Sequence, residues 1–354
     1  MESILITGGA GFVGSYLALK WKEKQSACKI KVLDNLRRRG SELNLPRLKK
    51  AGIEFFHGDI RLPEDLEQVG EVQLLVECSA DPSVQAGVNH SPAYVIGTNL
   101  TGTVNCLEYA RKQGANFLFL STSRVYPIPL LRQIQLRETP TRFELMNDQN
   151  LPGVSEEGIS EDFPLEGHRS FYGATKLASE HIIQEYVANY DLKAVINRCS
   201  VLAGSWQMGK VDQGVVSLWM IRHFFRQSLR YIGFGGTGKQ VRDVLHLQDL
   251  FQLLWHQHKE IQQHAGKVYN VGGGRENSVS LRELTSLCEK YTGNSVEILP
   301  QPQTNPQDIP LYISDCRRVR NVFNWHPTVS IEEILEEIAR WLRDYRSQLE
   351  YVFT

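Results

Sequence analysis

The sequence lacks any run of about 18 consecutive apolar residues, the length that crosses a membrane. Its first residues, MESILITGGAG, lack the basic flank and long apolar stretch of a secretion signal. A charge excess is also missing, because 39 lysines and arginines face 40 aspartates and glutamates, whereas nucleic-acid-binding domains usually carry a basic surplus. We therefore expect a soluble, cytoplasmic protein that has neither a nucleic acid nor a membrane as a partner.

Motifs of metal sites and of several enzyme classes are missing too. The six cysteines are widely separated and form no CxxC pair, so they fit reduced core thiols better than a disulfide framework or a zinc site. His256, His258 and His264 cluster, but two of them stand only two residues apart, so a solvated helix end is a better interpretation than a metal site. We expect no metal. The sequence has neither a GxSxG nucleophile elbow nor a P-loop lysine, which leaves hydrolase and kinase functions without support.

The 354 residues, 42% of them hydrophobic, suffice for a large core and about two domains. In the first 120 residues, short apolar runs alternate with stretches of helical spacing, which predicts a parallel sheet covered by helices on both faces. The expected strands here are Ser3 to Thr7, Ile30 to Leu33, Ile53 to His57, Leu74 to Glu77 and Phe117 to Leu120, and the expected helices are Phe12 to Glu23 and about Pro92 to Gln113.

This alternation breaks between Pro127 and Arg169. From Glu138 to Glu166 the chain holds eight acidic residues against Arg142 alone. So long a loop is either a partly helical excursion that covers a site or a solvated surface insertion, and both interpretations stay open. Periodicity then resumes with an expected helix from about Ser170 to Tyr190, a strand at Ala194 to Asn197, and helices near Leu247 to Gln262, Ser280 to Tyr291 and Ile331 to Tyr345.

The strongest local motif is TGGAGFVG, in which Gly8, Gly11 and Gly14 follow an expected strand and open a helix. Glycines there permit a tight turn and a close backbone approach, and the amides at the helix N-terminus attract a pyrophosphate. Asp34 lies 20 residues beyond Gly14, where its carboxylate can accept hydrogen bonds from an adenosine ribose. The alternative is a glycine turn that only packs the helix on the strand.

The charges near Asp34 leave two cofactors possible. Its carboxylate would repel the 2'-phosphate of NADP and so favours NAD. The basic triplet Arg37, Arg38 and Arg39 could attract that phosphate or could be a solvated loop, and we prefer NAD. Asp59, just after the third strand, is expected to meet the adenine together with Ile60, or to cap a helix.

A second motif is Tyr172 followed by Lys176 in SFYGATK. Four residues make one helical turn, so both side chains share a helix face. A tyrosine with an ordinary pKa of about 10 becomes a useful base only when nearby cations stabilise its phenolate, and Lys176 supplies one. Thr122 ends the fifth expected strand, where ligands of an open parallel sheet bind. The alternative for Tyr172 and Lys176 is an amphipathic helix surface.

In this order, the features resemble the extended short-chain dehydrogenase/reductase family, in particular its nucleotide-sugar epimerases and dehydratases. The resemblance covers almost the whole chain. Glu77 and Ser79 depart from it, because they stand where HLA is more usual after the fourth strand. Besides TGGAGFVG and YGATK, the matching motifs are DNL at Asp34, HGDI at His57, TNLTGT around Asn99, VRDVLH around Arg242, YNVGGG at Tyr269 and WHP at Trp325.

The resemblance implies an α/β fold: a Rossmann-type doubly wound parallel sheet with a smaller mixed C-terminal lobe that binds the substrate. The NAD-binding domain is expected mainly in residues 1–195, with 127–169 inserted, and the lobe mainly in 196–354, with a strand or helix near 241–262 returning to the first domain. The residues expected to bind NAD are Gly8, Gly11, Phe12, Val13, Gly14, Asp34, Asn35, Asp59, Ile60, Ser79, Ala80, Asn99, Tyr172, Lys176, Cys199 and Ser200.

It also implies roles at the reacting centre. Thr122 would hold the reacting hydroxyl, Tyr172 would remove its proton, and Lys176 would orient the ribose and tune the tyrosine. Ser123 and Arg124 are expected next to the sugar. Arg242 matches a position that usually contacts the diphosphate of the sugar nucleotide.

A narrower resemblance runs from Arg198 to Gly214, RCSVLAGSWQMGKVDQG, followed by GFGGTGKQVRDVLH. It points to a subgroup of these epimerases that acts on CDP-linked sugars and inverts C2. Gln207, Asp212 and Gln213 are therefore candidates for recognition of the sugar or the cytidine. A strand-to-helix turn capped by Asp212 is an equal alternative.

The implied reaction is a redox-neutral epimerisation through a transient keto-sugar, with hydride returned to the opposite face. The same residues serve oxidation at C4 equally well, so a C4 epimerase, a dehydratase or a decarboxylase of another nucleotide sugar remains an alternative. A further alternative is a sensor that binds the dinucleotide but catalyses no reaction. The resemblance also implies a homodimer or a homotetramer.

Overall fold

The computed structural model describes residues 2–210 and 213–353, which form two compact units. Residues 127–169, which the sequence interpretation inserts into the first domain, lie in the second unit. The chain returns to the first unit at Leu250, inside the expected 241–262 segment. The first unit comprises the chain up to Val125, Ser170–Arg198 and Leu250–Tyr269, and the second comprises Tyr126–Arg169, Cys199–Asp249 and the chain from Asn270.

A seven-stranded sheet has the strand order β14-β10-β5-β4-β1-β2-β3. The pairs from β3 through β5 are parallel, and the chain moves from β1 outward to β3 before it crosses back to β4. The strand order therefore reverses between β1 and β4, the place where doubly wound sheets bind ligands. The strands are β1 (Ser3–Thr7), β2 (Lys29–Asp34), β3 (Glu54–His57), β4 (Leu74–Glu77), β5 (Asn116–Thr122), β10 (Ala194–Cys199) and β14 (Val268–Val271).

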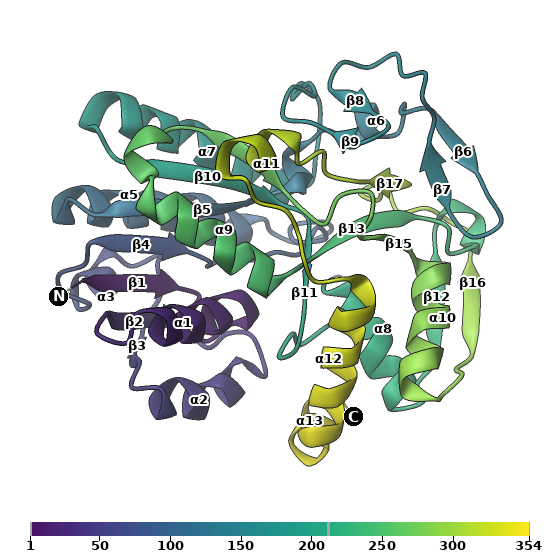
Figure 1. Ribbon diagram of the computed structural model, residues 1–354, viewed down its shortest axis with the longest axis horizontal. Helices are drawn as coiled ribbons and strands as arrows, with labels where there is room; N and C mark the ends of the chain where they lie inside the picture. The colour runs from purple at the N-terminus through teal and green to yellow at the C-terminus, as the bar shows by residue number, and fades with distance from the viewer. Residues whose placement is uncertain (1, 211–212, 354) are drawn as a thin grey trace. The chain divides into compact units, whose positions relative to one another are not determined.

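Helices cover both faces of this sheet (Figure 1), as the alternating pattern predicts. Leu66 on α3, Leu107 on α5 and Ile183 on α7 pack in one buried cluster with residues from β1, β2, β4, β5 and β10. On the other face, Trp21 of α1 meets Phe251 of α9 edge to face at 5.3 Å. The helices of this unit are α1 (Phe12–Lys24), α2 (Leu45–Lys50), α3 (Pro63–Glu67), α4 (Ala93–Ile96), α5 (Gly102–Gln113), α7 (Phe171–Tyr190) and most of α9 (Leu247–Lys259).

The second unit mixes short strands and helices. Parallel and antiparallel pairs both occur on β13, which is parallel to β11 and β17 and antiparallel to β15. Its strands are β6 (Leu136–Glu138), β7 (Phe143–Leu145), β8 (Val154–Ser155), β9 (Gly158–Ile159), β11 (Val201–Ala203), β12 (Leu229–Ile232), β13 (Val241–His246), β15 (Ser278–Ser280), β16 (Ile298–Gln301) and β17 (Leu311–Tyr312). Its helices are α6 (Ile128–Leu131), α8 (Val215–Phe224), α10 (Leu281–Thr292), α11 (Arg317–Phe323), α12 (Ile331–Asp344) and α13 (Arg346–Phe353).

The predicted fold class is confirmed, because a parallel Rossmann-type sheet and a smaller mixed region are both present. The segment 127–169 is neither a long helix nor an unstructured loop. It contains the short helix α6 and two small antiparallel hairpins, β6–β7 and β8–β9. Leu136 and Leu145 of the first hairpin pack against the buried cluster of Val241, Leu311 and Ile313, which explains why the segment belongs to the second unit.

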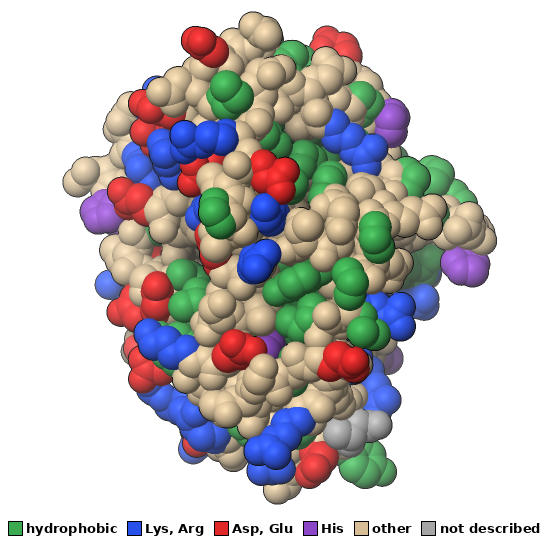
Figure 2. All heavy atoms as spheres, turned by 90° about the vertical axis from the view of Figure 1, so that its right-hand side faces the viewer, with side chains coloured by type: hydrophobic (Ala, Val, Ile, Leu, Met, Phe, Trp, Pro, Cys, Tyr) green, Lys and Arg blue, Asp and Glu red, His purple; other side chains and the backbone are tan. Residues whose placement is uncertain are grey.

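Acidic and basic side chains are interspersed on the face that Figure 2 shows, without a large patch of one sign. This distribution follows from the balanced charge of the sequence. None of the helices in residues 2–210 and 213–353 is both long and apolar enough to cross a membrane. Within the same residues, histidines, cysteines and carboxylates form no group that could hold a metal ion.

Candidate active site

The glycine turn after β1 is packed so closely that side chains would not fit there. A Cβ on Gly14 would lie 2.3 Å from the carbonyl oxygen of Gly8, and one on Gly8 would lie 2.9 Å from the backbone of Cys78 and Ser79. Gly8 also has a φ of 63°, which favours glycine. Gly11 is the N-cap of α1 and provides no side-chain cap, so the first amides of the helix, which include Phe12 and Val13, stay available for an anion.

Asp34 ends β2 beside this turn. Its Oδ2 accepts a hydrogen bond from the amide of Ala10 at 3.0 Å, and its Oδ1 accepts one from the amide of Leu36 at 2.8 Å. Burial raises the pKa of Asp34, and these two backbone hydrogen bonds oppose the increase. The carboxylate is thus fixed at the glycine turn with further lone pairs for a ribose diol. The turn, the uncapped helix and this carboxylate together fit a dinucleotide such as NAD.

Asp59 and Asn35 form a polar pair at the ends of β3 and β2. Asn35 Nδ2 donates to Asp59 Oδ2 at 2.8 Å, and Arg61 donates to both oxygens of Asp59. Burial opposes ionisation, but the hydrogen bonds from Arg61 and Asn35 lower the pKa of Asp59 to about 2. The guanidinium carbons of Arg37 and Arg61 lie 3.7 Å and 4.8 Å from the ring centroid of Tyr94. Arg37 of the basic triplet is thus stacked on an aromatic ring of its own unit.

Asn99 acts on the loop that follows β4. Its Oδ1 accepts from the amide of Asp81 at 2.8 Å, and its Nδ2 donates to the carbonyl of Asp81 at 3.0 Å. Asn99 is fully buried in a π-helical turn, η2 (Gly97–Thr101), between α4 and α5. This turn interrupts the single helix expected from Pro92 to Gln113, and such turns often occur at functional sites. Asn99 therefore fixes the backbone next to Ser79 and Ala80.

Ile60, the other residue expected near the adenine, is buried below α5. A Cβ on Gly102 would come within 2.6 Å of its Cδ1, and its carbonyl accepts a hydrogen bond from Asn105 at 2.9 Å. Gly102 therefore allows α5 to approach this side chain. The contact ties the loop after β3 to the sheet.

The three residues expected at the reacting centre lie on two elements that pack together, β5 and α7. Thr122 ends β5, and its Oγ1 accepts from the amide of Arg124 at 3.1 Å. Tyr172 and Lys176 stand one turn apart at the start of α7, whose N-cap Ser170 accepts from the amide of Gly173 at 3.2 Å. Ser123 and Arg124 begin the short 3-10 helix η3 (Ser123–Val125), which follows Thr122 directly and also contacts α7.

Lys176 is almost fully buried, with 2% of the residue exposed. Its Nζ lies 4.1 Å from the ring centroid of Phe119, a residue of β5, which gives a cation–π contact. A buried ammonium close to Tyr172 stabilises a phenolate, as base chemistry at neutral pH requires.

A buried ionic network that the sequence motifs did not indicate lies behind Thr122. Ser121 donates to Glu180 Oε1, and Arg198 Nη2 donates to Glu180 Oε2 at 2.8 Å. Glu180 and Arg198 are only 2% and 4% exposed. The network connects β5, α7 and β10, and so fixes the strand and the helix that carry the candidate catalytic residues. In the sequence, the only indication of a role for Glu180 is that it stands one helical turn after Lys176.

The remaining predicted residues lie in the second unit. Cys199 is buried, and Ser200 donates its amide to Val271 at 2.9 Å. Gln207 uses both ends of its amide inside the unit, since Nε2 donates to the carbonyl of Leu202 at 3.0 Å and Oε1 accepts from Ser217 at 2.6 Å. Gln213 lies in a bridge with Lys210. Asp212, a candidate for substrate recognition or capping, lies outside the described residues.

Arg242 on β13 already has acidic and carbonyl partners. Its Nη2 donates to Asp308 Oδ1 and to the carbonyl of Ile309, both at 2.8 Å, and its Nη1 donates to the carbonyl of Val241 at 2.7 Å. Arg242 is mostly buried and Asp308 is about a quarter exposed. A diphosphate that binds Arg242 would therefore compete with the Asp308 carboxylate.

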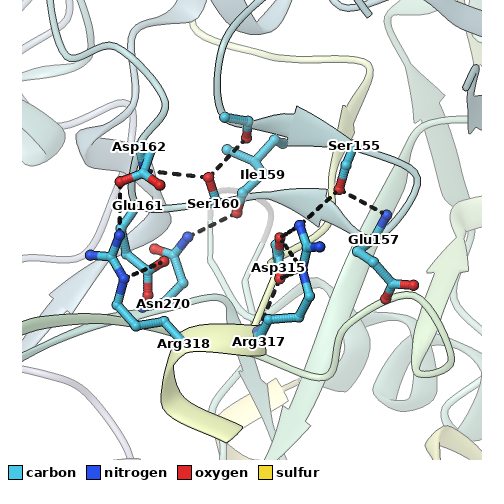
Figure 3. Close-up of polar contacts among 11 residues, drawn as sticks. Ser155, Glu157, Ile159, Ser160, Glu161, Asp162, Asn270, Asp315, Arg317 and Arg318 are labelled. Carbon is cyan, nitrogen blue, oxygen red and sulfur yellow. Dashed lines mark hydrogen bonds and ion pairs between the residues drawn. The ribbon is translucent and has the colours of Figure 1, made fainter. Parts of the chain in front are cut away.

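The hairpin β8–β9 and the residues after it are attached to the C-terminal part of the second unit (Figure 3). Glu161 accepts from the amide of Asn270 at 2.7 Å, and Asn270 Nδ2 donates to the carbonyl of Ile159 at 2.8 Å. Arg318 lies between Glu161 and Asp162, with Nη2 2.8 Å from Asp162 Oδ1. Burial raises the pKa of Glu161, so this contact with Arg318 helps to keep the carboxylate charged.

Comparison with known proteins identifies the family. The model of the NAD dependent epimerase/dehydratase family matches residues 4–272. The chain belongs to this family. It is 31% identical over 352 residues to CDP-paratose 2-epimerase of Salmonella typhi, with 96% of this chain and 98% of the relative covered. It is 27% identical to UDP-glucose 4-epimerase of Erwinia amylovora, with 96% and 97% covered.

The structures agree with this assignment. The crystal structure of UDP-glucose 4-epimerase from Thermus thermophilus in complex with NAD has a TM-score of 0.76 and 25% identity, and covers 96% of this chain and 99% of that one. The family that the sequence motifs indicated is thus confirmed. The predictions that the protein is an epimerase-type enzyme and that its cofactor is NAD are confirmed as well. The predicted alternative of a non-catalytic sensor is not supported.

Proposed function

We propose that this protein is an NAD-dependent epimerase of a CDP-linked sugar that inverts C2 and interconverts CDP-paratose and CDP-tyvelose. The observation that carries the proposal is the full-length similarity to CDP-paratose 2-epimerase, 31% identical over 352 residues. This value exceeds the 27% identity to the UDP-glucose 4-epimerase of Erwinia amylovora. The site geometry supports epimerase chemistry at either carbon, because Thr122, Tyr172 and Lys176 lie on β5 and α7, which pack together.

The chain's own residues perform the proton chemistry. Thr122 holds the reacting hydroxyl, and Tyr172 removes its proton while the hydrogen on the same carbon leaves as hydride. The chemistry that bound NAD supplies is reversible acceptance of that hydride. Lys176 stabilises the phenolate of Tyr172 and holds the ribose. Tyr172 then returns the proton to the carbonyl oxygen, and hydride return to the other face of the sugar completes the inversion.

The cofactor contacts are part of the proposal. The amides at the start of α1 hold the pyrophosphate, Asp34 accepts from the adenosine ribose, and Asp59 with Ile60 lies at the adenine. Ser79 and Ala80 contribute backbone that Asn99 fixes. Cys199 and Ser200 remain proposed contacts of the nicotinamide end.

The substrate contacts are proposed in the same way. Ser123 and Arg124 contact the sugar next to Thr122, and Arg242 binds the diphosphate. Gln213 and Asp212 belong to the cytidine or sugar site, whereas the bonds of Gln207 to Leu202 and Ser217 favour a role in shaping it. We further propose a cytoplasmic homodimer or homotetramer, as the resemblance implies.

Loss of water from the sugar is a less supported reaction. Dehydration usually needs an acid/base carboxylate beside the threonine, and Ser123 and Arg124 follow Thr122 instead. Epimerisation needs no such group, because a single base removes and returns one proton.

The experiment is to incubate the purified protein and NAD+ with CDP-, UDP- and GDP-linked sugars and to follow the configuration of C2 and C4 by NMR. Inversion at C2 of a CDP sugar is expected. Inversion at C4, or loss of water, would overturn the substrate assignment while it leaves the cofactor chemistry in place.

A further inference from the structure

A carboxylate that the proposed reaction does not use lies deep in the first unit. Glu77 ends β4, between Thr7 of β1 and Phe119 of β5 in the sheet register, and is fully buried. Its Oε1 lies 2.7 Å from Thr103 Oγ1. Within the part of the chain that the structure describes, Oε2 has no hydrogen-bond partner. A buried carboxylate with a free oxygen is costly unless a nearby charge compensates it.

That charge belongs to Lys176. The ammonium lies over the ring of Phe119, the register neighbour of Glu77 on β5, and it interacts electrostatically with the Glu77 carboxylate. Registered residues of neighbouring parallel strands point to the same face about 4.8 Å apart. Glu77, the Phe119 ring and Lys176 are therefore buried neighbours.

The hydrogen bonds of Thr103 can accommodate either protonation state of Glu77. Its hydroxyl lies 2.7 Å from Glu77 Oε1 and 2.8 Å from the carbonyl oxygen of Asn99. A hydroxyl has one proton, so it donates to Glu77 when the carboxylate is charged, and to Asn99 when Glu77 is protonated and donates to it. Burial raises the pKa of Glu77 to about 7, while Lys176 and Thr103 oppose the increase.

One other titratable group interacts with this pair. Cys106 of α5 is fully buried, and its pKa is raised by burial and by Glu77, while Lys176 lowers it. The thiol is therefore neutral at physiological pH and adds no charge. Thr7 and Phe119, the register neighbours in the sheet, carry none. Of Glu77, Cys106, Thr7 and Phe119, Glu77 is thus the group that can offer the ammonium a negative charge.

We propose that Glu77 is a positioning residue that supplies the counter-charge of Lys176 and holds its ammonium below Tyr172. The proposal rests on the proposed roles of Lys176 and Tyr172. Without Glu77, the buried ammonium would lose the stabilising field of this carboxylate, and a buried cation with less compensation loses its proton more easily.

The test compares pH profiles of kcat/KM for the wild type, Glu77→Gln, Glu77→Asp and the control Thr103→Val. Glu77→Gln keeps the shape of the side chain but removes its charge. We therefore expect kcat/KM of this variant to fall at a pH about one unit lower on the basic side, which corresponds to a tenfold change in the ratio of protonated to neutral Lys176. Glu77→Asp retains the charge, and Thr103→Val retains both charges, so their basic limbs should lie near that of the wild type.

A second readout does not depend on activity or on the folding of a variant. In 15N-lysine-labelled wild-type protein with its bound cofactor, the Nζ signal of Lys176 is assigned by its absence in Lys176→Arg. We expect the chemical shift of this Nζ signal to remain that of an ammonium group up to pH 9. Titration of this signal below pH 8 would overturn the proposal, even if Glu77→Gln did not fold.

The outcomes separate this proposal from the proposed function. If Tyr172→Phe and Lys176→Ala abolish turnover but the Glu77→Gln profile superimposes on that of the wild type, then Glu77 is not a positioning residue and the reaction mechanism stands. If Tyr172→Phe and Lys176→Ala retain full turnover, the mechanism itself is wrong.

Discussion

Charged side chains are used differently in the two units of this protein. In the first unit, Glu180 with Arg198 and Glu77 with Lys176 are almost fully buried next to the candidate catalytic residues. In the second unit, Arg317 and Arg318 are 60% and 41% exposed in their ion pairs with Asp315 and Asp162.

This difference in burial determines how strongly the loss of a charge affects the protein. A buried pair strongly resists the loss of one partner, because the remaining ion cannot be solvated. An exposed pair contributes about 1 kcal/mol or less, because water screens it. Substitutions in the buried pairs should therefore alter catalysis and stability, whereas those in exposed pairs should change both little. The following predictions test this contrast.

The largest effect is expected for Tyr172→Phe. Loss of the base should lower kcat by between a thousandfold and about ten-thousandfold, the upper part of the range for general acid–base catalysis. Steady-state kinetics measures the change, and NAD content after purification shows that the cofactor site persists. Tyr190→Phe, at the exposed end of the same helix, is the matched control and should be neutral. Comparable rates for both variants would contradict the role of Tyr172.

Glu180→Gln should destabilise the protein by about 3 kcal/mol, because it removes the carboxylate that is paired with the buried guanidinium of Arg198. Urea unfolding of the first unit measures this loss. Glu185→Gln, five residues later on the exposed side of α7, should change the free energy of unfolding by less than about 0.5 kcal/mol. Equal stabilities of the two variants would remove the contrast between buried and exposed charges.

Arg242→Gln should raise KM for the nucleotide sugar about tenfold and change kcat little, because a charge-assisted contact to the diphosphate is lost. Differential scanning calorimetry shows whether the loop around Asp308 loosens at the same time. An unchanged KM with a lower melting temperature would mean that Arg242 serves only that loop.

The smallest effect is expected for Arg61→Ala. The pKa of Asp59 is about 2, below its ordinary value of 3.8, so the pair stabilises the folded protein above pH 3.8 and this contribution is lost as the pH falls toward 2. Because Arg61 is 40% exposed, the contribution at pH 7 should be under about 1 kcal/mol. Unfolding curves at pH 7 and pH 3 measure it. A larger loss of unfolding free energy would show that the Asp59–Arg61 pair behaves like the buried pairs.

Much of the first unit could be predicted from the sequence. Its strands and helices carry strong periodicity, and the glycine turn, Asp34 and the Tyr172–Lys176 pair depend on local spacing. The structure confirms the strands β1, β3 and β4 and the helices α1 and α7 within two residues. The π-helical turn at Asn99 was missed because it leaves the apolar spacing of the helix almost unchanged.

The helices α10 and α12 of the second unit lie within one residue of the expected ones, but the buried pairs and the short hairpins could not be predicted in this way. Glu180 and Arg198 are brought together by packing between a helix and a strand, and no spacing encodes that contact. The hairpins β6–β7 and β8–β9 have strands of only two or three residues, too short for a period-two pattern. The partner of Arg242, Asp308, lies 66 residues away and became apparent only in the structure.

The measurement that tests the central claim most directly uses CDP-paratose deuterated at C2, converted in ordinary water and examined by NMR and mass spectrometry. Removal and return of a hydride predicts that the CDP-tyvelose formed retains the deuterium at C2, and that the Tyr172→Phe variant forms almost none. Replacement of the label by solvent hydrogen during inversion would show that C2 is deprotonated instead, and would contradict the account.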